Sequence, residues 1–121
     1  MPKAVRNPWD AEEVLRRLVR IRLALGPNVA DICAQLGYKS NKWSNWENRH
    51  NGLSLGEAIH IVERLGLSLD YIYRGKDDVG IATDVLPKLR KITNEMVMRE
   101  MDTPKGRGRP RKSDYKSEAA D

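Results

Sequence analysis

Residues 29–49 constrain the fold of this chain more than any other stretch. They read VADICAQLGYKSNKWSNWENR, which is two short amphipathic segments joined at Gly37. Glycine readily adopts the left-handed conformation that ends a helix, so the pattern predicts two helices with a tight turn between them. The apolar positions that recur at helical spacing and would face a core are Ile32, Cys33, Leu36, Trp43 and Trp46.

The second helix of this pair, over 40–47, is predicted to have a polar outer face, and its N-cap is either Lys39 or Ser40. A helix with a bulky apolar back and a short polar face can enter the DNA major groove. Ser and Asn hydrogen-bond to base edges, and Lys neutralises phosphate. The candidate residues for the major groove are therefore Ser40, Asn41, Lys42, Ser44 and Asn45.

Helical periodicity predicts three further helices around this pair, so that residues 10–75 form an all-α bundle of five helices. A capping-box pattern of Asp10 and Glu13 begins the first helix, although the preceding Asn-Pro pair could begin it earlier. This helix ends at Gly26. The other helices have clear N-caps and terminating glycines, which are Asn28 and Gly37, Ser54 and Gly66, and Ser68 and Gly75.

The segments outside this unit have simpler patterns. Residues 1–9 predict an irregular arm, and residues 76–83 predict a linker rich in Gly and Asp. Residues 84–101 predict one accessory helix, with a proline tolerated in its first turn. The apolar stripe of this helix consists of Leu86, Leu89, Ile92 and Met96. The stripe would either form a dimer interface or pack back on its own domain.

The composition fits one small domain with a basic tail. No apolar run approaches the ~20 residues of a membrane span, no signal peptide is evident, and a single cysteine cannot form an internal disulfide. We therefore expect a cytoplasmic protein. The net charge is +5, and residues 104–112 contain five Lys or Arg and no acid. The excess positive charge is local, which favours a nucleic-acid contact by this segment.

Residues 102–121 are poor in apolar groups and are expected to be disordered when free. Within them KGRGRPRK at 105–112 resembles an AT-hook. Its glycines would let the backbone approach the floor of an A·T-rich minor groove, where Arg107 and Arg109 would extend. The alternatives are a nuclear localisation signal or a generic basic tail that acts by counterion release. The basic residues left for phosphates are Lys105, Arg111 and Lys112.

Residues 14–75 resemble the Cro/repressor-type helix-turn-helix of the Xre family. The resemblance rests on RLALG at 22–26, LG at 36–37, SNWE at 44–47 and LGLSLDYI at 65–72. It implies a compact five-helix bundle that places helix 40–47 in the major groove. The chain departs from the family pattern at three positions, with Val29 in place of a Gln, Cys33 in place of a smaller residue, and Arg49 in place of a Gly.

The resemblance also pairs Arg22 with Glu47. Both residues sit at the ends of apolar helices, where an unpaired charge would be costly. A bidentate pair would fix the angle of the reading helix and leave an N–H for phosphate. Around the two paired helices, the residues expected to contact phosphate are Asn28, Lys39, Arg49, His50 and Asn51.

These patterns favour a transcription regulator that binds double-stranded DNA, most simply a repressor that works as a homodimer. The alternative is an antitoxin-type autoregulator, in which helix 84–101 would dock a protein partner. An enzyme is not expected, because the sequence has no nucleophile–base pair, metal-ligand cluster or phosphate loop. No cofactor or metal is expected, and Cys33 is interpreted as an inert buried residue.

Overall fold

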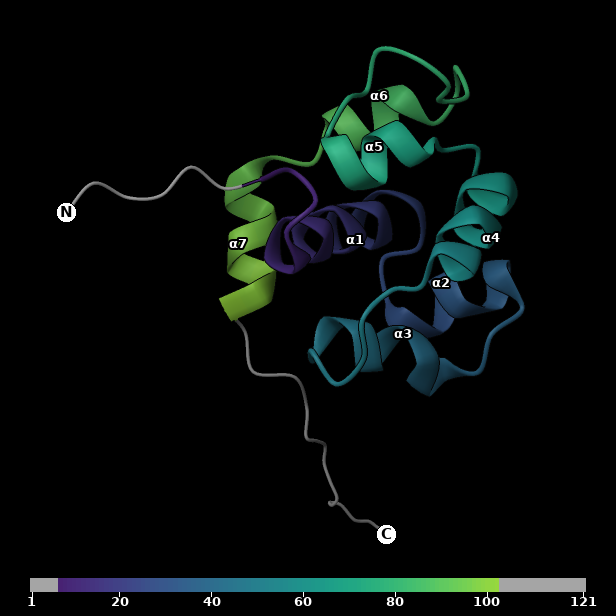
Figure 1. Cartoon of the computed structure of the whole chain (residues 1–121), viewed down its shortest axis with the longest axis vertical. Coiled ribbons are helices and arrows are strands. Elements are labelled where there is room, and N and C mark those ends of the chain that lie inside the picture. The colour runs from purple at the N-terminus through teal and green to yellow at the C-terminus, as the bar shows by residue number, and fades with distance from the viewer. Residues whose placement is uncertain (1–6, 103–121) are drawn as a thin grey trace, which may run out of the picture.

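The computed structural model describes residues 7–102, apart from the side chain of Ser40, and this part of the chain forms helices and no strand. The all-α prediction is confirmed. In Figure 1, α1 lies in the middle, with α2 and α3 on one side of it and α5 and α6 on the other. The helices are α1 (Ala11–Leu25), α2 (Val29–Leu36), α3 (Ser40–Glu47), α4 (Leu55–Leu65), α5 (Leu69–Arg74), α6 (Leu86–Arg90) and α7 (Asn94–Asp102).

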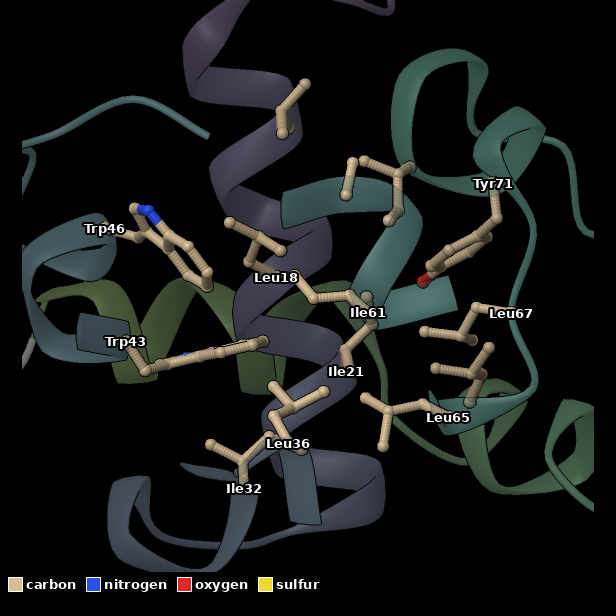
Figure 2. Packing of buried hydrophobic residues seen from close by; sticks show 14 of the residues in the cluster. Leu18, Ile21, Ile32, Leu36, Trp43, Trp46, Ile61, Leu65, Leu67 and Tyr71 are labelled. Carbon is tan, nitrogen blue, oxygen red and sulfur yellow. The ribbon is translucent and has the colours of Figure 1, made fainter. Parts of the chain in front are cut away.

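The core surrounds α1, because the apolar stripe of every helix from α2 to α5 turns toward it (Figure 2). Each of these helices contributes a fully buried side chain to the core, and α1 contributes Ile21. The others are Ile32 of α2, Trp43 of α3, Ile61 of α4 and Ile72 of α5. Burying such side chains is the main source of stability in a bundle of this size.

The helix ends follow the predicted signals in α2, α4 and α5, where Asn28, Ser54 and Ser68 each accept a backbone N–H. The predicted capping box of Asp10 and Glu13 is wrong. Asp10 is the N-cap of α1, but its carboxylate instead accepts the backbone N–H of Asn7 at 3.2 Å, so the preceding turn occupies it. The N-cap of α3 is Lys39, which makes no side-chain capping bond.

The prediction of one accessory helix over 84–101 was also wrong, because the chain breaks into α6 and α7. The carbonyl oxygen of Ile92 accepts a hydrogen bond from Arg20 of α1. The hydroxyl of Thr93 accepts the N–H of Met96 at 3.1 Å, which starts a new helix. The break places α7 across α1 (Figure 1), where Ile92 and Val97 pack on Leu15 and Val19 of α1.

The apolar stripe of residues 84–101 therefore packs back on its own domain. Leu89 joins the main core, and Ile92 is also buried, whereas Met96 remains 38% exposed. Residues 76–83, the predicted linker, are non-helical, and the N–H of Ala82 donates to the carbonyl of Gly66 at 2.8 Å. Within residues 7–102, no helix has the length and apolar character needed to cross a membrane.

The junction of α1 and α2 depends on a close backbone approach at Gly26. A Cβ at this position would lie 2.8 Å from the backbone nitrogen of Ile32, and backbone cannot move aside cheaply. Gly26→Ala should therefore lower the free energy of unfolding by ~1–3 kcal/mol, as overpacking does. Gly56→Ala is the matched control, because a Cβ there meets no atom within 4 Å.

The control substitution should leave stability unchanged or raise it by ~0.4–1 kcal/mol, since alanine restricts the unfolded chain. Urea denaturation of both variants measures the difference. Equal stability of the two variants would contradict the close approach at the α1–α2 junction.

Candidate nucleic-acid interface

Two tryptophans hold the inner side of α3 in the core. Trp43 is completely buried and Trp46 is 4% exposed, and their rings meet edge to face with centroids 5.3 Å apart. Tyr38, from the turn before α3, packs edge-on against Trp46 at 5.9 Å. The interpretation of both tryptophans as core residues is confirmed, so neither ring is available to stack on a base.

The turn between α2 and α3 has the predicted glycine geometry. Gly37 has φ 74° and ψ 25°, which is the left-handed region, and its N–H donates to the carbonyl of Ala34. The N–H of Tyr38 donates to the carbonyl of Cys33 at 2.9 Å. These bonds close the end of α2 and set the direction in which α3 departs.

The outer side of α3 is polar and borders an open cavity. Asn41 is exposed, whereas Lys42, Ser44 and Asn45 are half-buried. The cavity measures about 590 Å³, and the predicted contact residues that line it come from α3 and from both of its flanking loops. They are Lys39, Asn41, Lys42, Asn45 and Asn51.

A carboxylate that the sequence analysis missed also lines this cavity. Glu57 of α4 pairs with the ammonium group of Lys42 at 2.6 Å, and Lys42 lies over the ring of Tyr38. Burial alone would raise the pKa of Glu57, but hydrogen bonds from Lys42 and Ser54 outweigh it and lower this pKa. The hydrogen bond to Glu57 in turn raises the pKa of Lys42. The ammonium group of Lys42 is thus already paired with a carboxylate of its own domain.

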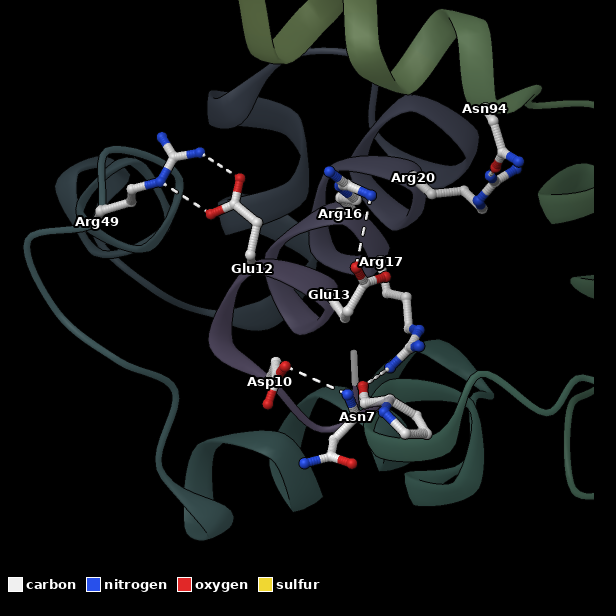
Figure 3. Close-up of polar contacts among 10 residues, drawn as sticks. Asn7, Asp10, Glu12, Glu13, Arg16, Arg17, Arg20, Arg49 and Asn94 are labelled. Carbon is white, nitrogen blue, oxygen red and sulfur yellow. Dashed lines mark hydrogen bonds and ion pairs between the residues drawn. The ribbon is translucent and has the colours of Figure 1, made fainter. Parts of the chain in front are cut away.

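Arg49 is held in the same way on the other side of α3. Its guanidinium forms a bidentate pair with Glu12 of α1, at 3.1 Å from Nε and 2.6 Å from Nη2 (Figure 3). The hydrogen bond to Glu12 raises the pKa of Arg49. The backbone of Arg49 has φ 64°, a left-handed conformation that glycine adopts more easily.

The loop after α3 is organised by the backbone carbonyl of Asn45. It accepts the N–H of His50 at 2.8 Å and that of Asn51 at 3.3 Å. The side chains of His50 and Asn51 are left exposed beside α3. Asn28 is also exposed, although its side-chain oxygen already accepts the N–H of Asp31 as the N-cap of α2.

The predicted Arg22–Glu47 pair is present and buried, with side chains 3% and 2% exposed. Nε of Arg22 lies 2.5 Å from Oε2 of Glu47, and Nη2 lies 3.1 Å from Oε1. The indole N–H of Trp43 donates to the same carboxylate at 2.6 Å. The pair therefore joins α1 to α3 and satisfies the buried tryptophan as well.

Contacts inside the protein occupy four of the five N–H groups of this buried Arg22, so at most one N–H on Nη1 is left for phosphate. Nη1 donates to the carbonyl of Pro27 at 2.9 Å, and Nη2 also reaches Oε2 of Glu100 in α7 at 2.7 Å. Burial lowers the pKa of Arg22, but the hydrogen bonds that it donates to Glu47 and Glu100, with their negative charges, raise it by more. Glu100 lies 78 residues away along the chain, and no local pattern could have indicated it.

Two sets of predicted contacts, the side chain of Ser40 and the tail residues 105–112, lie outside the described residues.

Within residues 7–102, no three His, Cys, Asp or Glu side chains come together to hold a metal ion. A comparison of the chain with protein-family models, curated proteins and solved structures finds no match.

The buried ion pair predicts unequal roles for the two carboxylates that contact Arg22. Glu47→Ala should lower the free energy of unfolding by ~3–5 kcal/mol, because it removes the inner partner of a buried charge. Glu100→Ala should cost at most ~1 kcal/mol, since Glu100 is one-third exposed and water can replace it. Chemical denaturation measures both, and similar small losses would show that the inner pair does not hold α3 to α1.

Proposed function

We propose that this protein binds a specific DNA sequence through α3 and regulates transcription, acting as a repressor. One observation carries the proposal. The two tryptophans of α3 lie in the core, while its polar side chains face outward around an open cavity. An α-helix with its side chains is about 10–12 Å across and can fit a major groove about 12 Å wide. A cytoplasmic, nucleoid-associated location goes with this proposal.

In this proposal Asn41 and Asn45 read bases, because the asparagine amide can pair bidentately with adenine. Ser40 and Ser44 are adaptable polar contacts on the same helix. The residues proposed to hold phosphates and so position the helix are Asn28, Lys39, His50 and Asn51.

Lys42 and Arg49 would exchange their carboxylates for DNA groups on binding. Both ion pairs involve partly exposed side chains, with Lys42 39% and Arg49 56% exposed. Exposed pairs of this kind are worth only ~0–1 kcal/mol, so the exchange costs little. Glu12 and Glu57 would then stand beside the DNA backbone and disfavour poorly aligned complexes through repulsion.

Two further features support a helix-turn-helix of the resembled family. The Arg22–Glu47 pair is buried and holds α3 to α1. Arg49 stands where that family commonly has glycine, and its φ of 64° suits a glycine. A homodimer on DNA is part of the proposal, because one short helix reads few base pairs and two-fold operators match two-fold proteins. The proposal names no dimer interface, because α7, part of the predicted interface helix, packs against α1 of its own domain.

A second candidate is an autoregulating antitoxin whose protein partner docks on α7. It is favoured by Met96 and Met98, which stay 38% and 39% exposed on that helix. Methionine adapts to varied partner surfaces. Isolation of the protein in a stoichiometric complex from its native cell would favour this candidate, provided that Met96→Ser and Met98→Ser together abolish the complex.

The first prediction of the proposal concerns Asn41 and Asn45. Asn41→Ala and Asn45→Ala should each cost ~1–3 kcal/mol at one cognate base pair and relax specificity there. Thr83→Ala is the control, because Thr83 is an exposed polar residue before α6, outside α3 and its flanking loops. Fluorescence anisotropy with a duplex selected from a random pool, and with its scrambled form, makes the comparison. Equal losses on both duplexes would remove both residues from sequence recognition.

The second prediction concerns the AT-hook-like tail at 105–112. We propose that Arg107 and Arg109 enter an A·T-rich minor groove beside the operator, and that Lys105, Arg111 and Lys112 contact phosphates. A tether raises the effective concentration of such a weak second contact. Arg107→Ala with Arg109→Ala should abolish any preference for A·T over G·C flanks.

The control for the tail is Lys105→Ala with Lys112→Ala, which removes the same charge from outside the RGRP core. It should weaken binding to both kinds of flank equally and reduce the salt dependence. If the two double variants behave alike on both flanks, the tail acts only as a charge.

A further inference from the structure

A second cavity lies on the side of α1 that faces α5, α6 and α7, away from α3 (Figure 1). Its volume is about 560 Å³, within the range of ~300–1,000 Å³ that small-molecule sites occupy. Residues of α6 and α7, on either side of the break between these helices, complete its lining. None of its lining residues belongs to α3.

Four arginines line this cavity, three from two neighbouring turns of α1 and one from α6. They are Arg16, Arg17, Arg20 and Arg90. Two acidic residues, Glu13 and Asp77, also line it, so the lining carries an excess of two positive charges. The pairs between the two kinds of residue are long, at 3.5 Å for Arg16–Glu13 and 3.3 Å for Arg90–Asp77. An excess of fixed cations in a cavity attracts anions.

The two central arginines are held largely by neutral acceptors. Arg17 donates to the carbonyls of Pro8 and Ile72, at 2.6 and 2.8 Å. Arg20 donates to the carbonyl of Ile92 and to the side-chain oxygen of Asn94 (Figure 3). These bonds fix the guanidinium groups in place without cancelling their charge. Burial lowers the pKa of Arg17, which is the sign of a cation held away from water.

Two buried polar atoms of this cavity have no hydrogen-bond partner among the described residues. They are the hydroxyl of Tyr71, in a residue that is only 6% exposed, and Nε of Arg16. Leaving such a group unpaired costs ~1–3 kcal/mol. Burial raises the pKa of Tyr71 to about 12, so the hydroxyl keeps its proton at neutral pH. Both groups can therefore donate to an anion.

We propose that this cavity binds a small phosphate monoester, with the phosphate among the arginines and the Tyr71 hydroxyl. Guanidinium groups match phosphate oxygens in bidentate geometry, and four of them line this cavity. The remainder of the ligand would contact the apolar side chains of Leu89, Val97 and Met98, which also line the cavity. Binding would tighten α6 and α7 against α1. This inference does not depend on DNA binding.

Calorimetric titration of the full chain with glycerol 3-phosphate and with inorganic phosphate tests the proposal. We expect saturable binding of both, tighter for glycerol 3-phosphate because of its carbon chain. Arg16→Gln should weaken binding about tenfold or more, because it removes a guanidinium cation, and Tyr71→Phe about three- to tenfold, because it removes one hydroxyl donor. Arg64→Gln, on the exposed face of α4, is the matched control and should change nothing.

Absence of saturable binding would overturn the proposal, and so would equal weakening by Arg16→Gln and Arg64→Gln. Tyr71→Phe keeps the ring in the core, so it tests the site even if Arg16→Gln disturbs the fold. A DNA duplex provides the last comparison. If DNA displaces glycerol 3-phosphate, and Arg16→Gln weakens DNA binding by the same factor, the cavity holds a DNA phosphate and the small-molecule assignment is wrong.

Discussion

The buried pair of Arg22 and Glu47 is the interaction on which the rest of the structure depends. Its two side chains are almost completely buried, so each charge would be costly without the other. The bidentate contact, the indole N–H of Trp43 and the carbonyl of Pro27 together satisfy the groups involved. The pair links α1, α3 and the turn before α2 in one geometry. Glu100 extends this link to α7. A bidentate ion pair fixes the relative direction of two helices more narrowly than apolar packing alone. Such a constraint is what the proposed function requires of α3.

The outward surface around α3 is polar and contains acidic as well as basic side chains. At its edges, Lys42 pairs with Glu57 and Arg49 pairs with Glu12. Such pairs are partly exposed and screened by salt, so they can exchange partners at small cost. The outward face of α3 consists of short amide and hydroxyl side chains, which carry hydrogen-bond information rather than charge. In the proposed function, positive charge for affinity comes largely from the 105–112 tail, while α3 supplies selectivity.

The sequence predicted local features well and long-range features poorly. The Gly37 turn, the buried tryptophans and the Arg22–Glu47 pair followed from helical spacing, left-handed glycine and family resemblance. The single helix over 84–101 was wrong, because Arg20 takes the carbonyl of Ile92 and Thr93 starts a new helix. Glu12, Glu57 and Glu100 were missed as partners of candidate residues. Each meets its cation across the bundle, and nothing near a carboxylate in sequence indicates which distant cation it will face.

Recognition of DNA by α3 can be tested by amide chemical-shift mapping of the labelled protein on addition of a selected operator duplex. If α3 reads the bases, the largest shift changes fall on residues 39–51, above all on Asn41 and Asn45, and α5 and α6 change little. A scrambled duplex should move the loop residues but leave these two asparagines nearly unchanged, because phosphate contacts carry no sequence information. Changes centred on α6 and α7, with α3 unaffected by either duplex, would contradict recognition of DNA by α3.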